Sequence, residues 1–238
     1  MIDTHCHLLP ALDDGPATIH DALELARLLV ADGVTSVLCT PHYSRQFRTR
    51  HADALARHET LRSELAAVGI TLETAVAAEV SPAFAMSAPL EELVLRSVGR
   101  RFLVVEVLAD SPGALFAMVS ERLGPHGLVP VFGHPERSRA VQRVPSVVDE
   151  ARRYGALVQI LAPSLLGRWG PEVAAATLEL LDTGRADLLA SDAHGANRRR
   201  VHLAEAGKLV EERLGSGVLA ELTERGPAAV LAAAHPHT

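Results

Sequence analysis

The sequence contains little cysteine and no long apolar run. Its 238 residues include only two cysteines, Cys6 and Cys39, which is too few for a disulfide framework and typical of a reducing compartment. No uninterrupted apolar stretch approaches the roughly 20 residues that a membrane-spanning helix needs. The first residues also lack the basic region, apolar core and cleavage site of an export signal. We therefore expect a cytoplasmic protein without stable membrane insertion.

An excess of positive charge is also missing. The chain has 23 basic against 29 acidic residues, a formal net charge of −6, which gives no general electrostatic reason to bind nucleic acid or an anionic membrane surface. Lysine is almost absent, since Lys208 is the only one. The other basic residues are arginines, and Arg is the better bidentate partner for phosphate. We therefore expect no nucleic-acid partner, whereas a small anion would suit these side chains.

Apolar, β-branched runs alternate with segments of helical period along the chain. This alternation is typical of repeated βα units around a parallel sheet. A capping box of Thr18 and Asp21 predicts the start of the first helix, and segments that open with Pro and close with Gly predict helices over 145–155 and 171–184. Seven runs are predicted to be strands: 2–7, 34–40, 72–79, 102–108, 128–133, 156–162 and 186–191.

Seven strands with helices between them favour a closed barrel. We predict one α/β domain over residues 1–238, a distorted seven-stranded (β/α)7 barrel similar to a TIM barrel, with an open doubly wound sheet as the second choice. After the last strand, helical segments are predicted at about 200–213, 216–224 and 227–234. Residues 234–238 are expected to be a disordered tail.

Metal-binding side chains stand at six of the seven predicted strand ends. In α/β barrels, the catalytic residues gather at the carboxyl ends of the strands. One His or carboxylate at a strand end is usually a solvated loop residue, but six such ends together indicate one shared site. The residues concerned are His5 and His7, His42, Glu79, Glu106, His134, and Asp192 with His194.

The spacing of these residues indicates metal ions. His5 and His7 alternate along a strand, so both imidazoles face one side, as two ligands of one ion require. Glu106 interrupts the apolar run VVEVL, where a carboxylate without a cation would be costly. Mixed imidazole and carboxylate ligands suit Mn²⁺, Fe²⁺ or Zn²⁺. The number of candidates predicts two or three ions with at least one bridging carboxylate.

Six stretches, in order along the chain, resemble the PHP (polymerase and histidinol phosphatase) superfamily of metal-dependent phosphoesterases, which are seven-stranded barrels. The stretches are MIDTHCHLLPALDDG, CTPHY, AAEV, GHPER, LLGRWG and SDAH. Within the superfamily, the chain is most similar to bacterial manganese-dependent tyrosine-protein phosphatases of capsule and exopolysaccharide assembly. The resemblance implies hydrolysis of phosphotyrosine on a protein, a bacterial tyrosine kinase of capsule or exopolysaccharide synthesis as the partner, and a metal-activated water as the nucleophile.

The resemblance also implies three ions, with Mn²⁺ as the first choice and Fe or Zn as alternatives. Glu79 would bridge two of them, and the spacing leaves Asp13 as an alternative to Asp14, which we favour. Arg137 and Arg199 would bind the phosphate. The implied ligand sets are His5, His7, Glu79 and Asp192 for one ion, Glu79, Glu106 and His134 for a second, and Asp14, His42 and His194 for a third.

Three other hypotheses stay open at this point. Cys39 and Arg45 have the C-x5-R spacing of cysteine-dependent phosphatases, although Pro41 removes an N–H from that loop. A second hypothesis keeps the metals but changes the substrate to a small phosphate such as histidinol phosphate or a nucleotide. The third is a metal-binding regulatory barrel without turnover. Trp169 in LLGRWG either lines the mouth of the site or packs within its loop.

Two positions depart from the tyrosine phosphatases that the chain resembles. Gly195 stands where those proteins more often have Asn, and Leu161 stands where a polar residue is common. Both departures bear on substrate preference and leave the implied metal ligands intact.

Overall fold

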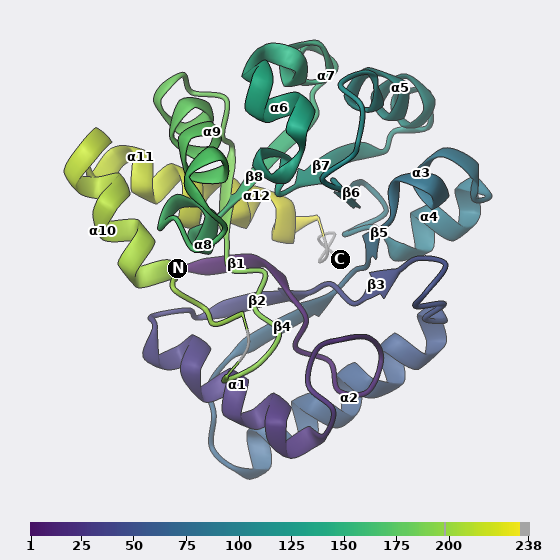
Figure 1. Ribbon diagram of the computed structural model, residues 1–238. Helices are drawn as coiled ribbons and strands as arrows, with labels where there is room; N and C mark the ends of the chain where they lie inside the picture. Colours follow the sequence, from purple (N-terminus) through teal and green to yellow (C-terminus); the bar gives the residue numbers. More distant parts are fainter. Residues whose placement is uncertain (198, 234–238) are drawn as a thin grey trace.

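The computed structural model describes residues 1–197 and 199–233. The tail predicted over 234–238 lies outside the described residues. Strands occupy the centre of the molecule and helices lie around them (Figure 1). The strands are β1 (Ile2–Cys6), β2 (Ser36–Cys39), β3 (His42–Tyr43), β4 (Glu73–Val76), β5 (Glu79–Val80), β6 (Phe102–Glu106), β7 (Val129–Gly133), β8 (Leu157–Leu161) and β9 (Leu188–Ala190).

The strands form two parallel sheets. One has the order β1-β2-β4 and the other the order β3-β5-β6-β7-β8-β9, and all neighbours are parallel. The predicted strand 34–40 forms β2 alone, and the short β3 follows beyond Pro41, which cannot donate to a ladder, whereas the predicted strand 72–79 is divided between β4 and β5. The parallel βα architecture is therefore confirmed, whereas a single closed seven-stranded sheet is not confirmed.

The first and last strands nevertheless lie side by side. Cys6, at the end of β1, forms a parallel bridge with Ala193, just beyond β9. His7 N donates a hydrogen bond to Ala193 O at 2.9 Å, and Asp192 N donates to His5 O at 2.9 Å. These bonds bring the His-x-His and Asp-x-His motifs together from opposite ends of the chain.

Helices cover the outer faces of the strands (Figure 1). The predicted capping box forms, since Asp21 N donates to Thr18 Oγ1 and Thr18 N donates to Asp21 Oδ2. The helix predicted over 145–155 is instead a 3₁₀ turn followed by a short helix. The helices are α1 (Ile19–Ala31), α2 (His51–Ala67), α3 (Pro82–Ser87), α4 (Leu90–Arg96), α5 (Ala114–Leu123), α6 (Arg139–Arg143), α7 (Asp149–Arg153), α8 (Ala162–Leu165), α9 (Pro171–Asp182), α10 (Leu203–Leu214), α11 (Ser216–Ala220) and α12 (Gly226–Ala232), with 3₁₀ turns η1 (Gly124–His126), η2 (Pro135–Arg137) and η3 (Pro145–Val148) and the π turn η4 (Glu221–Arg225).

Apolar side chains on both faces of the strands form two cores. The larger core lies between strands and helices, where Phe116 of α5 packs edge-on against Phe132 of β7 with ring centroids 4.8 Å apart. The smaller core uses the alternate strand positions, such as Leu38 and Val104, and Val230 of α12 completes it. Because both faces are buried, the strands are continuous apolar runs, and polar side chains stand out at their ends.

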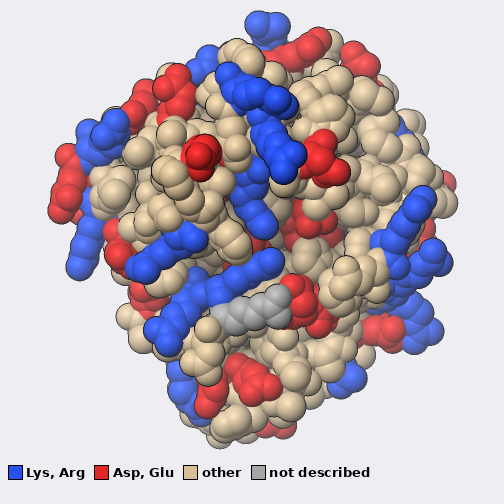
Figure 2. Space-filling view, viewed as in Figure 1, with Lys and Arg blue, Asp and Glu red and all other residues tan. Residues whose placement is uncertain are grey.

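Two expectations concern the surface. Of the helices in the described part of the chain, none combines the length and the apolar character needed to cross a membrane. Basic and acidic side chains are interspersed on the face shown in Figure 2. The expected absence of a nucleic-acid partner stays a prediction.

We expect Phe116→Ala to lower the free energy of unfolding by about 3–5 kcal/mol, because it removes a fully buried ring and leaves a cavity beside Phe132. Urea denaturation measures this change. Met118→Ala on the same helix is the control, since that side chain is exposed and its loss should cost less than about 1 kcal/mol. Equal losses for both variants would contradict the proposed packing.

Candidate metal centre

All nine side chains predicted to bind metal come together at one end of the strands. They form four overlapping groups in which one nitrogen or carboxylate oxygen of each residue lies within 4.8 Å of the others. These groups differ from the expected sets in two ways. His7 joins the expected set of Asp14, His42 and His194, and Glu106 and His134 lie with Glu79 in two separate groups. The groups are His7, Asp14, His42 and His194; His5, Glu79 and His134; His5, His7 and Asp192; and His42, Glu79 and Glu106.

The carboxyl ends of the strands position these residues. The breaks after β2 and β4 matter most, because the ladder restarts with β3 and β5, where His42 lies in register with Glu79. His5 and His7 come from the end of β1, Glu106 from the end of β6, His134 from the turn after β7, and Asp192 and His194 from the segment after β9.

Four imidazoles have a defined tautomer. His5 Nδ1 lies 2.8 Å from Gln159 Oε1, and His7 Nδ1 lies 2.7 Å from Asp13 Oδ2. His134 Nδ1 and His194 Nδ1 face the backbone carbonyls of Val107 and Asp192 at 3.2 and 2.8 Å. Each partner atom only accepts hydrogen bonds, so each Nδ1 carries the proton and each Nε2 presents a lone pair to the cluster.

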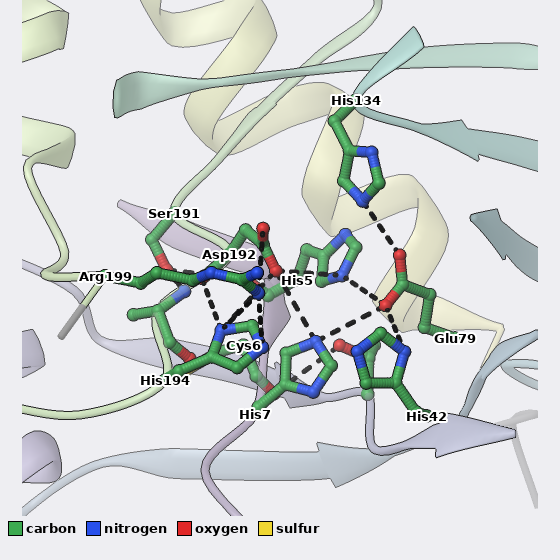
Figure 3. Close-up of polar contacts among 12 residues, drawn as sticks. His5, Cys6, His7, His42, Glu79, His134, Ser191, Asp192, His194 and Arg199 are labelled. Atoms are coloured by element: carbon green, nitrogen blue, oxygen red, sulfur yellow. Dashed lines mark hydrogen bonds and ion pairs between the residues drawn. The ribbon is translucent and has the colours of Figure 1, made fainter. Parts of the chain in front are cut away.

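Glu79 faces four imidazoles of the cluster (Figure 3). Its side chain is fully buried, and its Oε1 lies 2.9 Å from His134 Nε2. Its Oε2 lies 2.9 Å from His42 Nδ1 and 3.4 Å from the Nε2 atoms of both His5 and His7. The carboxylate oxygens and imidazole lone pairs thus face one another, and this arrangement is stable only with protons or cations between them.

The pKa shifts of His5, Glu79 and Glu106 also indicate that the cluster requires positive charge. Burial disfavours the charged form of His5, but Glu79 and Asp192 outweigh it and raise the pKa of His5 to about 9. Burial also opposes ionisation of Glu79, yet His5 and His42 hold the pKa of its carboxyl well below the usual range. For Glu106, burial and the charge of Glu79 raise the pKa. Bound cations would satisfy all three carboxylates at once.

The structure separates the roles of Asp13 and Asp14. Asp13 Oδ2 accepts hydrogen bonds from His7 Nδ1 and from His42 N at 2.9 Å, and its Oδ1 accepts from Gly15 N at 2.9 Å. Asp14 Oδ1 instead faces the cluster, 3.3 Å from His194 Nε2 and 3.5 Å from His42 Nε2. Asp14 is therefore placed as the ligand candidate, and Asp13 orients His7.

Three non-glycine residues at this site have left-handed backbone conformations. His134, Asp192 and Arg199 have φ values of 43°, 52° and 48°, and a left-handed conformation costs a non-glycine residue of order 1–3 kcal/mol. Hydrogen bonds hold these conformations, since His134 N donates to Gln159 O at 2.8 Å and His194 N donates to Arg199 O at 3.0 Å. Strain of this kind is typical of functional sites, where the surrounding structure fixes one geometry.

The two predicted phosphate-binding arginines lie beside the cluster. Arg137 Nη1 lies 3.8 Å and Arg199 Nη1 lies 4.0 Å from Asp192 Oδ2. Arg199 Nη1 also donates to His194 Nε2 at 2.8 Å (Figure 3). A pocket next to them is lined by Trp169 together with Asp192 and Arg199, so Trp169 lines the mouth of the site.

Comparison with known proteins agrees with this geometry. The model of the family described as capsular polysaccharide synthesis, CpsB/CapC, matches residues 1–232. This chain belongs to the CpsB/CapC family. It is 30% identical to the tyrosine-protein phosphatase YwqE of Bacillus subtilis over 94% of this chain and 89% of that protein. It is 24% identical to the tyrosine-protein phosphatase CpsB of Streptococcus agalactiae over 88% of this chain and 89% of that protein.

A solved structure supports the same relationship. It belongs to work on YwqE from Bacillus subtilis and CpsB from Streptococcus pneumoniae, described as metal-dependent tyrosine phosphatases. The alignment has a TM-score of 0.87 and 29% identity, and it covers 98% of this chain and 95% of that one. The family resemblance inferred from the sequence is thus confirmed.

This CpsB/CapC family member has two site residues that the sequence predictions did not include. Gln159 accepts from His5 Nδ1 and donates from Nε2 to Thr4 Oγ1 at 2.7 Å. Glu136 is fully buried and accepts from Leu161 N at 3.1 Å. Gln159 interrupts the apolar strand LVQIL in the way that Glu106 interrupts VVEVL, so the same signal was available for it.

The alternative based on a cysteine nucleophile has no structural support. Cys39 is a free, fully buried cysteine at the end of β2, and burial raises the pKa of its thiol. Arg45 is exposed. A buried thiol of raised pKa supplies no thiolate to attack a phosphate.

We expect Gln159→Leu to lower the affinity for the metal by about 10- to 100-fold, because it removes the acceptor that fixes the tautomer of His5. Metal titration followed by calorimetry measures the affinity. Gln46→Leu is the matched control, since Gln46 is exposed on a loop. An unchanged affinity in a folded Gln159→Leu variant would contradict this role.

Proposed function

We propose that this chain is a metal-dependent protein-tyrosine phosphatase whose cluster holds three metal ions, with Mn²⁺ as the first choice. The observation that carries the proposal is the set of three imidazoles, those of His5, His7 and His134, with Nδ1 protonated and Nε2 directed at the buried carboxylate of Glu79. The names of the relatives YwqE and CpsB supply the reaction. The proposed ligands are the nine expected ones: His5, His7, Asp14, His42, Glu79, Glu106, His134, Asp192 and His194.

The donor set fits such ions. Among the described residues, the buried atoms His5 Nε2, His7 Nε2 and Glu79 Oε2 have no hydrogen-bond partner, although they lie close together. Buried polar atoms are normally paired, and the three atoms here are all of types that bind Mn²⁺, Fe²⁺ or Zn²⁺. Neither Cys6 nor Cys39 reaches the groups, which argues against a structural zinc site.

The chain's own residues would prepare the phosphomonoester for hydrolysis. When bound, the ions would lower the pKa of water and neutralise the charge that develops on the phosphoryl oxygens and the leaving phenolate. Arg137 and Arg199 would bind the remaining phosphoryl oxygens and fix the orientation of the phosphorus. Asp13 and Gln159 would keep the imidazole rings of His7 and His5 in place.

We propose a phosphotyrosine protein as the substrate. We further propose a bacterial tyrosine kinase of capsule or exopolysaccharide synthesis as the partner and the cytoplasm as the location. The family's description, capsular polysaccharide synthesis, supports the process. The finer description of the fold as a distorted seven-stranded barrel belongs to the same proposal, with the hydrogen bonds between β1 and the segment after β9 in its support.

We expect chelation to abolish hydrolysis of a phosphotyrosine peptide and added Mn²⁺ to restore it. Glu79→Gln should lower the rate by at least about 100-fold, because it removes the bridging charge. Phosphate release measures both effects, and metal analysis should show fewer ions per Glu79→Gln chain.

The control is Glu64→Gln, since Glu64 is exposed on α2. Full activity of the metal-free protein would refute the proposed function. Hydrolysis of histidinol phosphate in preference to the phosphopeptide would replace the substrate and leave the metal site standing.

A further inference from the structure

The single tryptophan of the chain contacts both arginines at the site mouth. The Trp169 ring centroid lies 4.7 Å from Arg137 Cζ and 5.7 Å from Arg199 Cζ. The three side chains come from different segments: Arg137 from η2 after β7, Trp169 from the loop after α8, and Arg199 from the segment after β9. Guanidinium groups within about 6 Å of an indole ring are attracted to its π face. One ring therefore joins two cations that would otherwise repel each other.

We propose that Trp169 is a positioning residue, which holds the Arg137 and Arg199 guanidinium groups over the metal cluster as one phosphate-binding clamp. The inference rests on the proposed function, since it concerns how the phosphomonoester is held. It assigns the indole ring to the two arginines and not to the aryl group of the substrate.

The arginines need such a support, because their other contacts are weak. Within the described residues, the Arg137 guanidinium makes no hydrogen bond, and its nearest carboxylate oxygen is 3.8 Å away. Arg199 has one short contact, to His194 Nε2, and its carboxylate contacts are both 4.0 Å long. Arg side chains lose much rotamer freedom when they are ordered. A ring that orders both side chains before phosphate arrives reduces the entropic cost of binding.

The loop that carries Trp169 is itself fixed. Gly167 and Gly170, which flank the Arg168-Trp169 pair, have φ values of 73° and 99°, a region that favours glycine. Arg168 N donates to Pro163 O at 2.9 Å and closes the turn. This turn presents the ring at the mouth with 37% of its surface exposed.

A buried carboxyl links this loop to the turn that bears Arg137. Glu136 Oε1 accepts from Leu161 N at 3.1 Å, immediately before α8 begins. Because Glu136 precedes Arg137 in η2, the bond ties the Arg137 turn to the segment that leads to Trp169. The fold thus fixes the position of the Trp169 loop relative to the turn that carries Arg137.

The test compares Trp169→Leu and Trp169→Phe with the wild-type protein, all loaded with Mn²⁺. The readouts are the inhibition constant of inorganic phosphate and the kcat and KM for a phosphotyrosine peptide. Inorganic phosphate has no aryl group, so it reports on the arginines alone. Tyr154→Leu is the matched control, because Tyr154 is an aromatic residue that is exposed away from the site.

We expect Trp169→Leu to raise the inhibition constant of phosphate and the KM by roughly tenfold each, with an unchanged metal content, and Trp169→Phe to restore most of the loss. A purely structural role would lower kcat through loss of folded enzyme and leave the inhibition constant as it is. An unchanged inhibition constant of phosphate overturns the inference. If the KM for the peptide then rises, the ring is assigned to the aryl group of the substrate. If the KM is also unchanged, the ring has no role in binding.

A second measurement needs no variant and no turnover. Trp169 is the only tryptophan, so the intrinsic fluorescence of the wild-type protein reports on the clamp directly. Titration of the Mn²⁺-loaded protein with inorganic phosphate should change the emission and saturate at the inhibition constant, and an emission that stays constant would overturn the inference. If the wild-type protein fails to hydrolyse the phosphopeptide, the proposed function is wrong, while this titration still decides whether the clamp binds phosphate.

Discussion

The arrangement of the site depends on one buried carboxylate. Glu79 is fully buried, and its two oxygens face the nitrogens of four imidazoles. A carboxylate in such a place is costly unless positive charge accompanies it. The neutral rings of His5, His7 and His134 direct lone pairs and not positive charge at Glu79, because their Nδ1 protons are donated to Gln159, Asp13 and the Val107 carbonyl. Cations at this point would therefore contribute to folding as well as to catalysis.

The sheets of this fold are interrupted at the metal centre. An uninterrupted β2 or β4 would carry regular pairing past the level at which His42 and Glu79 enter the cluster. The breaks after β2 and β4 instead let β3 and β5 restart in register at the site. On β7 and β9, the strands end just before His134 and Asp192, whose backbones are left-handed. Broken pairing and strained residues thus lie at the cluster, while the inner and outer apolar cores stabilise the rest.

The sequence predicted the parallel βα architecture and the gathering of the candidate side chains for a physical reason. Strands buried on both faces admit few polar residues, so Glu106 in VVEVL and the histidines at strand ends were conspicuous. The sequence could not predict where the ladders break, because a run such as 72–79 looks the same whether one strand or two form. The sequence favoured Asp14 over Asp13 without settling the choice, since only the three-dimensional path of the turn decides which carboxylate faces His7 Nδ1 and which faces His194 Nε2.

Substrate preference must be decided outside the ligand set. His5, His7 and Glu79 are fully buried, so they cannot recognise one phosphoprotein in preference to another. The departure at Leu161 also lies in the interior, where its side chain is fully buried and its N–H donates to Glu136 Oε1. A buried side chain contacts no protein substrate, so this position can act only through the segment that it anchors, α8 and the loop of Trp169. Discrimination between phosphoprotein substrates therefore falls to the exposed residues around the site mouth and not to the buried ligands.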